Sequence, residues 1–138
     1  MACAISATAR SNASALAFDG FVDTWEALSG ADVVVVPSRV EPFGNVAVEA
    51  GLAGRPVVAS RVGGLPEIVR NRETGLLVAP ERVDELAAAL EVLARRPELR
   101  ACLGAAAHER CTRLFGVREG GPPADARLLE IIAAVAAA

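Results

Sequence analysis

Two carboxylates, Glu41 and Glu49, stand eight positions apart in the stretch of this chain whose residue types are best suited to chemistry. An ionised carboxylate accepts several hydrogen bonds, so two of them around one pocket suit a ligand rich in hydroxyl groups, such as a ribose or a hexose. With Glu41 in a loop and Glu49 on the helix that follows, the two side chains can flank one pocket. Taken alone, Glu41 is better explained as a solvated loop residue, and its interest comes from its position eight residues before Glu49.

The stretch between the two carboxylates opens a helix, which the bounding glycines predict from Gly44 to Gly54. The first amides of a helix have no partner inside it, and together with the helix dipole they favour an anion such as a phosphate. Gly44 has no Cβ and allows a ligand to approach the backbone closely. The pattern therefore predicts an anion site at the start of this helix.

Glu49 is the only charged residue between Val46 and Leu52, where every other side chain is apolar or absent. A helix that is apolar all round is typical of a buried helix, and a buried carboxylate is costly unless it has partners. Two interpretations stay open. Glu49 is either a structural residue satisfied by backbone or an Arg, or a carboxylate held ready for a ligand hydroxyl.

Two strands on either side of this helix position the stretch. The runs Val33–Val36 and Pro56–Ser60 are apolar on both faces, which favours the middle of a covered parallel sheet, and with the helix they form a βαβ unit. In open α/β sheets ligands bind at the carboxyl ends of the strands. The later pair Gly63-Gly64 allows either a tight turn or direct contact with a ligand.

The remaining elements extend the same alternation. We predict a strand at Leu76–Val78 and helices at Glu81–Arg95 and from Pro97 to about Leu114. The order β-α-β-α-β-α-α predicts a Rossmann-like α/β fold with a parallel sheet. A short helix from Thr24 to Ser29 precedes it, with Thr24 as its expected N-cap.

The chain divides into three expected parts. Residues 1–17 have no clear period and are expected to form a poorly ordered arm, residues 18–116 a partial domain, and residues 117–138 a linker and a last helix over Ala124–Ala136.

Composition excludes several functions. The 138 residues carry a net charge of −3, which argues against a nucleic-acid partner, and all basic residues are Arg, which excludes a Walker A or Schiff-base lysine.

Three cysteines (Cys3, Cys102 and Cys111) without a CxxC motif are expected to be reduced thiols of a cytoplasmic protein. The lone His108 is expected at the surface. No apolar run is long enough to span a membrane, so any contact with a membrane surface is expected only through a partner.

The order of these motifs resembles that of the family 4 (group 1) glycosyltransferases with the two-domain GT-B fold. The likeness extends from about Phe18 to about Phe115 and corresponds to the back half of a C-terminal donor-binding domain. The motifs that carry it are Ala31-Asp32-Val33, Pro37-Ser38, Glu41-Pro42-Phe43-Gly44-x4-Glu49, Gly63-Gly64-x-Pro66-Glu67 and Thr74-Gly75-Leu76-Leu77-Val78.

The resemblance implies a role for each matching residue. Glu49 is implied to hold the ribose hydroxyls of the nucleotide, and Glu41, the implied catalytic residue, to contact the transferred sugar near the reacting carbon. Sugar oxygens and the diphosphate are implied to bind the backbone amides of Phe43, Gly44, Asn45 and Val46, and the nucleobase to lie near Phe21. Family members usually retain the anomeric configuration and need no metal, so the resemblance implies transfer of a hexosyl group from a nucleotide diphosphate sugar with retention and without a metal or other cofactor.

The resemblance also identifies what the chain does not match. The acceptor-binding domain and the first half of the donor domain have no counterpart here, so a missing domain or a separate chain is an expected partner. The acceptor is unknown. The main alternative is a truncated, catalytically inactive donor-binding remnant or partner module. A sugar-nucleotide epimerase and a nucleotide-binding module for another ligand are further alternatives, although the chain has no GxGxxG motif for NAD.

Overall fold

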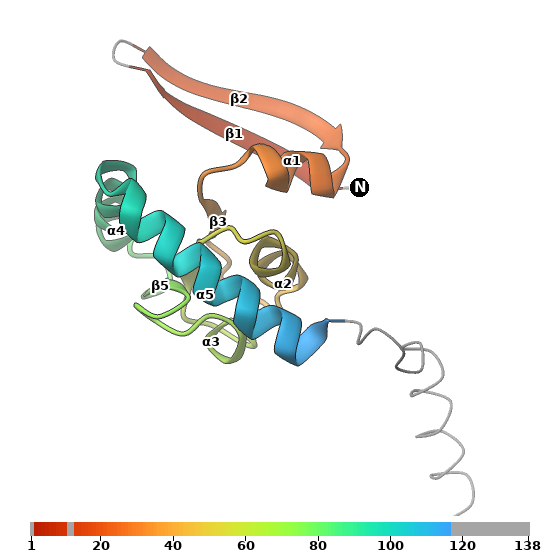
Figure 1. Cartoon of the computed structure of the whole chain (residues 1–138). Coiled ribbons are helices and arrows are strands. Elements are labelled where there is room, and N and C mark those ends of the chain that lie inside the picture. The colour runs from red at the N-terminus through yellow and green to blue at the C-terminus, as the bar shows by residue number, and fades with distance from the viewer. Residues whose placement is uncertain (1, 11–12, 117–138) are drawn as a thin grey trace, which may run out of the picture.

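The computed structural model describes residues 2–10 and 13–116, and its centre is a three-stranded parallel sheet (Figure 1). The strands lie in the order β3-β4-β5 and comprise Val34–Val36, Val57–Ser60 and Gly75–Val78. All four residues of β4 are buried, as expected for a central strand covered on both faces. The two runs that the sequence predicted as buried strands therefore pair with each other, Val35 opposite Val58.

Helices connect these strands in the predicted order, β3-α2-β4-α3-β5-α4-α5, which confirms the Rossmann-like α/β fold. The helices are α1 (Thr24–Gly30), α2 (Asn45–Leu52), α3 (Leu65–Ile68), α4 (Val83–Arg95) and α5 (Pro97–Phe115). The expected N-cap of the first helix is wrong by one residue. Asp23, not Thr24, caps α1, because its carboxylate accepts a hydrogen bond of 3.0 Å from the amide of Glu26.

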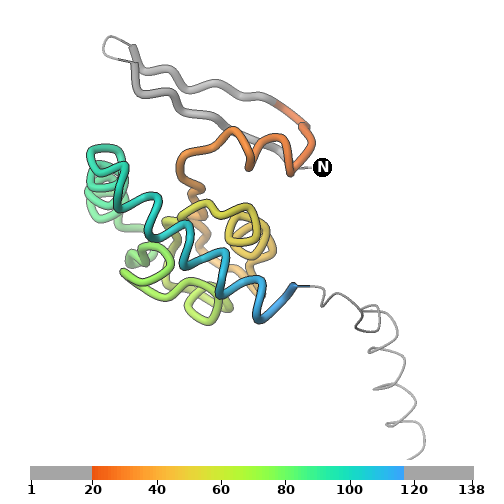
Figure 2. Tube along the Cα trace, in the orientation of Figure 1, coloured from red at the N-terminus to blue at the C-terminus, as the bar shows by residue number. Residues whose placement is uncertain are grey.

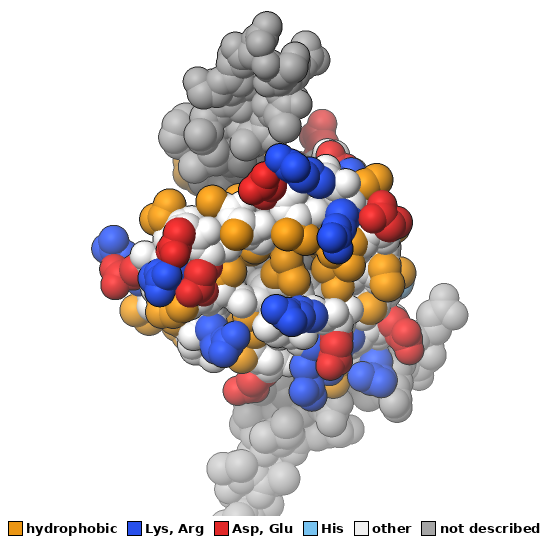
Figure 3. Space-filling view, turned by 90° about the vertical axis from the view of Figure 1, so that its left-hand side faces the viewer, with side chains coloured by type: hydrophobic (Ala, Val, Ile, Leu, Met, Phe, Trp, Pro, Cys, Tyr) orange, Lys and Arg blue, Asp and Glu red, His pale blue; other side chains and the backbone are white. Residues whose placement is uncertain are grey.

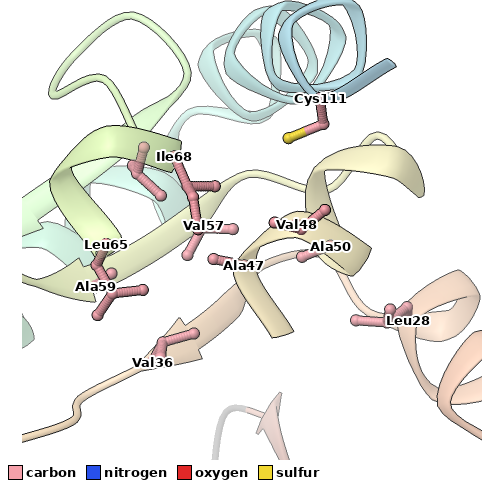
Figure 4. Packing of buried hydrophobic residues seen from close by; sticks show 11 residues of the cluster. Leu28, Val36, Ala47, Val48, Ala50, Val57, Ala59, Leu65, Ile68 and Cys111 are labelled. Atoms are coloured by element: carbon pink, nitrogen blue, oxygen red, sulfur yellow. The ribbon is translucent and has the colours of Figure 1, made fainter. Parts of the chain in front are cut away.

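Two apolar clusters cover the two faces of the sheet, because successive side chains of a strand point to opposite faces. Val57 and Ala59 of β4 belong to one cluster, which α2 and α3 complete with residues such as Ala47 and Leu65 (Figure 4). Val58 belongs to the other cluster, completed by Leu93 of α4 and Leu103 of α5, among others. Helices therefore lie on both faces of the sheet.

Helix α5 contributes a buried residue to each cluster, Cys111 to the first and Leu103 to the second, and its backbone runs beside α2 (Figure 2). Gly104 of α5 lies so close to the backbone of Gly54 that no Cβ fits between them. Near the other end of α5, the buried Cys111 lies against Gly51 of α2 with equally little space. Glycine at these positions lets the helix backbones approach, and α2 and α5 are held in one fixed arrangement.

The amino-terminal region contains a β-hairpin that the sequence did not predict. Strands β1 (Ala2–Arg10) and β2 (Ala13–Val22) form an antiparallel hairpin that leads into α1, with a register shift between Ala4 and Ile5 (Figure 1). Hairpin pairing uses backbone hydrogen bonds and does not require an apolar period, so a search for periodicity misses it. The division of the chain into three parts stays a prediction, and the expected helix over Ala124–Ala136 lies outside the described residues.

The surface combines both signs of charge. On one face of the molecule, hydrophobic side chains gather at the centre, with acidic and basic side chains interspersed around them (Figure 3). Within the part of the chain that the structure describes, no helix has the length and hydropathy needed to cross a membrane.

Candidate functional site

The stretch from Glu41 to Glu49 follows the carboxyl end of β3 and leads into the N-terminus of α2, as predicted. Gly44 is the N-cap, and its carbonyl accepts hydrogen bonds from the amides of Ala47 (2.9 Å) and Val48 (3.2 Å). The amides of Asn45 and Val46 precede the first helical hydrogen bond and have no acceptor in the helix. No side chain caps this N-terminus and no acidic residue lies in its first turn, so the favourable position for an anion is open.

Gly44 is required at the N-cap for two reasons. Its φ of 105° lies in a region that residues with a Cβ rarely adopt. A Cβ at this position would also come within 2.9 Å of Leu65 Cδ2 and 3.1 Å of Ile68 Cδ1, both side chains of α3. Gly44 is therefore buried against α3, while the helix N-terminus that it begins stays open.

The loop after β4 presses directly against the loop after β3. The amide of Gly64 donates a hydrogen bond of 3.2 Å to the carbonyl of Glu41. A Cβ on Gly63 would overlap that same carbonyl, and one on Gly64 would overlap the carbonyl of Phe43. Of the two explanations for Gly63-Gly64, the close approach of two backbones at this turn accounts for both glycines.

Helix α2 is buried on one face only, so the expectation of a helix enclosed all round is wrong. Its buried residues are Ala47, Val48, Ala50 and Gly51, which face the sheet and α5. Asn45, Val46 and Glu49 are exposed on the opposite face, with Val46 at 43%. Because the carboxylate of Glu49 is hydrated, no burial cost is associated with it and no structural partner is needed.

Six of the predicted site residues lie in one continuous stretch. Glu41 is half-buried in the loop, Phe43 is 50% exposed, and Gly44 follows as the N-cap. Asn45 and Glu49 are four residues apart, which places them one above the other on the exposed face of α2. The structure thus brings these residues to one edge of the sheet, and their individual roles remain predictions.

Phe21, the seventh predicted residue, lies in a different part of the molecule. It is a residue of strand β2, paired with Cys3, and its side chain is 75% exposed. The hairpin stands apart from the parallel sheet that carries the other six (Figure 1). The proximity of Phe21 to a nucleobase stays a prediction.

Three arginines follow the carboxyl ends of the three strands. Arg39 pairs with Glu81 at 3.1 Å, and Arg82 pairs with Asp84 at 2.6 Å. The hydrogen bond from Arg82 lowers the pKa of Asp84 to about 2. Arg61, after β4, is exposed and takes part in none of the ion pairs found among the described residues. Arg61 is thus the guanidinium on this edge that is most available to an added phosphate.

A shallow groove borders the loop after β3 on the side of α5. It is lined by Pro42, Phe43, Gly63, Gly64, Pro66, Glu67, Ile68, Arg70, Arg110, Leu114 and Phe115. The rings of Phe43 and Phe115 meet edge to face, with centroids 5.9 Å apart. No motif in the sequence associates Arg110 with this region. Its contacts depend on how α5 packs.

The described residues contain no group of three or more His, Cys, Asp or Glu side chains suited to a metal ion. The expectation that the site works without a metal or other cofactor stays a prediction.

Comparison with known proteins identifies the family. The model of the glycosyl transferases group 1 matches residues 4–96, and the chain belongs to this family. The D-inositol 3-phosphate glycosyltransferase of Saccharomonospora viridis is 52% identical over 83 residues, which are 60% of this chain and 19% of that protein.

Solved structures agree with this assignment. Sucrose-phosphate synthase from Thermosynechococcus elongatus is similar with a TM-score of 0.62 and 48% identity, over 64% of this chain and 22% of that one. The Anabaena protein Alr3699/HepE in complex with UDP-glucose gives a TM-score of 0.65 and 31% identity, over 70% of this chain and 27% of that one. These neighbours are GT-B glycosyltransferases. The chain spans about a fifth of the length of the relative from Saccharomonospora viridis.

Proposed function

We propose that this chain binds the nucleotide diphosphate sugar of a retaining, metal-independent hexosyltransferase. The observation that carries the proposal is the open N-terminus of α2 at the carboxyl edge of the sheet, with the hydrated carboxylate of Glu49 one turn further on. An anionic diphosphate suits the helix N-terminus, and a ribose diol suits the carboxylate. The complex of the related Anabaena protein with UDP-glucose supports this class of donor.

The proposed roles follow the positions of the residues. Glu49 accepts hydrogen bonds from the ribose hydroxyls, and the amides around Gly44, Asn45 and Val46 bind the diphosphate and sugar oxygens. Glu41 lies next to the transferred sugar. When the bond between the anomeric carbon and the diphosphate breaks, negative charge develops on the diphosphate. The dipole of α2 and a guanidinium such as that of Arg61 stabilise that charge where it forms.

Calorimetric titration tests the binding step. The purified chain is titrated with UDP, GDP and ADP, and with their glucose or mannose conjugates. We expect saturable binding to one nucleotide and its loss in Glu49→Ala. Glu109→Ala is the matched control, because Glu109 is an exposed helical glutamate on α5. A folded chain that binds none of these ligands, or a Glu49→Ala variant that binds as well as the parent, contradicts the proposal.

A second candidate is a donor-binding module without turnover of its own. The observation that favours it is the uncovered outer face of α2, where Val46 and Glu49 are exposed. One wall of a pocket binds a donor more weakly than two. Turnover is measured with the chain alone and after co-expression with the product of the neighbouring upstream gene. Turnover by the chain alone contradicts the module, whereas turnover that needs the second product supports it.

A further inference from the structure

Arg110 stands out among the residues that the proposed function does not use. It lies on α5, is half-buried, and takes part in none of the ion pairs of the described chain. Its guanidinium donates instead to two backbone carbonyls, those of Glu67 (Nη2, 2.7 Å) and Ile68 (Nε, 3.0 Å). These are the last two carbonyls of α3, and no amide inside so short a helix donates to them.

Helix α3, whose last two carbonyls accept from Arg110, also supports the loop after β3 through its side chains. A Cβ on Gly44 would come within 3.1 Å of Ile68 Cδ1 and within 2.9 Å of Cδ2 of Leu65, at the start of α3. Both side chains are buried, with exposures of 3% and 0%. A displacement of α3 therefore changes the support beneath the N-cap of α2.

A second connection runs through the two glycines that precede α3. Gly64 donates a hydrogen bond to the carbonyl of Glu41, and neither glycine leaves space for a shift toward the loop. The loop Glu41–Gly44 thus contacts the α3 segment at two points, the backbone carbonyl of Glu41 and Gly44, which is the N-cap of α2. Arg110 is the side chain that fixes the far end of that segment to α5.

We propose that Arg110 is a positioning residue. Through α3 it sets the conformation of the loop Glu41–Gly44, and through that loop it sets the affinity for the diphosphate and sugar of the donor. The second part rests on the proposed function. The planar guanidinium holds its donors in a fixed fork, and two of its nitrogens, Nε and Nη2, each donate to one of the two neighbouring carbonyls. An ammonium group carries all its donors on a single nitrogen, so Lys reproduces this contact only in part.

Amide resonances of the 15N-labelled full chain test the first part without a ligand. We expect Arg110→Ala to shift the amides of Gly64, Gly44 and Asn45, and Arg110→Lys to shift them less. Arg113→Ala is the matched control, because Arg113 lies on the same helix and is exposed. If the Ala variant does not fold, the Lys variant is judged by the same amides. Unmoved Gly44 and Asn45 amides in a folded variant overturn the inference.

Titration with UDP-glucose tests the second part. We expect Arg110→Ala to weaken binding by about fivefold to tenfold, as for the partial loss of a hydrogen bond to a charged group, and Arg113→Ala to leave it unchanged. Shifted amides with unchanged affinity support the positioning role but contradict donor binding at this loop. Should the parent chain not bind UDP-glucose, the proposed function fails with this donor, and the amides alone decide the role of Arg110.

Discussion

The two faces of α2 differ sharply in how closely they are packed. On the inner face, Gly51 lies so close to Cys111 that no Cβ fits, and the preceding loop presses on Gly63 and Gly64 with the same lack of space. On the outer face, Val46 is 43% exposed and Glu49 is hydrated. One helix therefore carries a close-packed surface and a bare one.

This difference separates stability from binding. Close packing on the inner face fixes the direction in which the N-terminus of α2 points, because interiors at crystal-like density cannot shift without clashes. The outer face contributes little to that packing and is free to carry polar groups. Substitutions on the inner face should change the free energy of unfolding, and substitutions on the outer face should change ligand affinity.

The largest effect is expected at Gly63, where the loops after β3 and β4 meet. Ala at this position would place its Cβ on the carbonyl of Glu41 and would also be strained at a φ of 50°. We expect Gly63→Ala to lower the free energy of unfolding by about 3 kcal/mol or more, since backbone cannot move aside as a flexible side chain can. Urea denaturation followed by circular dichroism measures it.

Gly30→Ala is the matched control for this variant. Gly30 ends α1, has no positive φ, and a Cβ added there would meet no atom within 4 Å. We expect it to be neutral or slightly stabilising, because Ala restricts the unfolded chain more than Gly does. Equal stability of the Gly63→Ala and Gly30→Ala variants would contradict the close contact between the two loops.

A smaller loss is expected at Gly51, on the inner face of α2. The Cβ of Gly51→Ala would meet the sulfur of Cys111, a side chain that can turn aside at some cost. We expect a loss of about 1–3 kcal/mol in the free energy of unfolding, typical of overpacking. Combining it with Cys111→Ala, which vacates the space, should restore part of the loss. Strict additivity of the two changes would show that the residues do not share this contact.

Thiol reactivity compares the interior beneath α2 with the surface. Burial raises the pKa of the Cys111 thiol, and the side chain is 2% exposed, whereas Cys102 is exposed on the same helix. Since the thiolate is the nucleophile, Cys111 has a smaller reactive fraction at about pH 8 than an unperturbed thiol. In a Cys3→Ser background we expect a disulfide reagent to modify Cys102 rapidly and Cys111 only as the protein opens.

Opening of the structure should separate the modification rates of the two thiols. Modification of Cys111 should accelerate in denaturant and in Gly51→Ala, and that of Cys102 should not. Equal rates for the two thiols in the native protein would mean that α5 does not cover Cys111.

The smallest effect on stability is expected on the outer face. We expect Glu49→Ala to change the free energy of unfolding by no more than about 0.5 kcal/mol, as for other exposed substitutions. The same variant should lose nucleotide affinity in the calorimetric titration. A large loss of stability in Glu49→Ala would instead support the structural interpretation of this carboxylate and remove the contrast between the two faces.

Much of the fold was predictable because its signals are local. The apolar runs that became β3 and β4, and the glycines around α2, mark their elements without reference to the rest of the chain. The position of Glu41, Gly44 and Glu49 at one sheet edge follows from that order, because loops after parallel strands share an edge. The hairpin of β1 and β2 was missed because its pairing depends on backbone bonds and not on an apolar period.

The burial of Glu49 was predicted wrongly for a different reason. Its neighbours on α2 are apolar, and sequence alone does not reveal how many faces of a helix are covered. The importance of Arg110 was missed for the same reason, since its partners, the carbonyls of Glu67 and Ile68, are more than forty positions away along the chain. Both the exposure of Glu49 and the contacts of Arg110 depend on which surfaces pack together in the folded chain.

Local sequence patterns were enough to specify the order of strands and helices from α1 to α5, the family, and the stretch from Glu41 to Glu49 as the candidate site. Those properties follow from periodicity and from motifs of adjacent residues. Tertiary packing was needed to establish that Gly63 and Gly64 serve a backbone contact, that Glu49 faces solvent, and that Arg110 holds α3. These depend on the distance between segments far apart in the chain, which packing sets and local residue types do not.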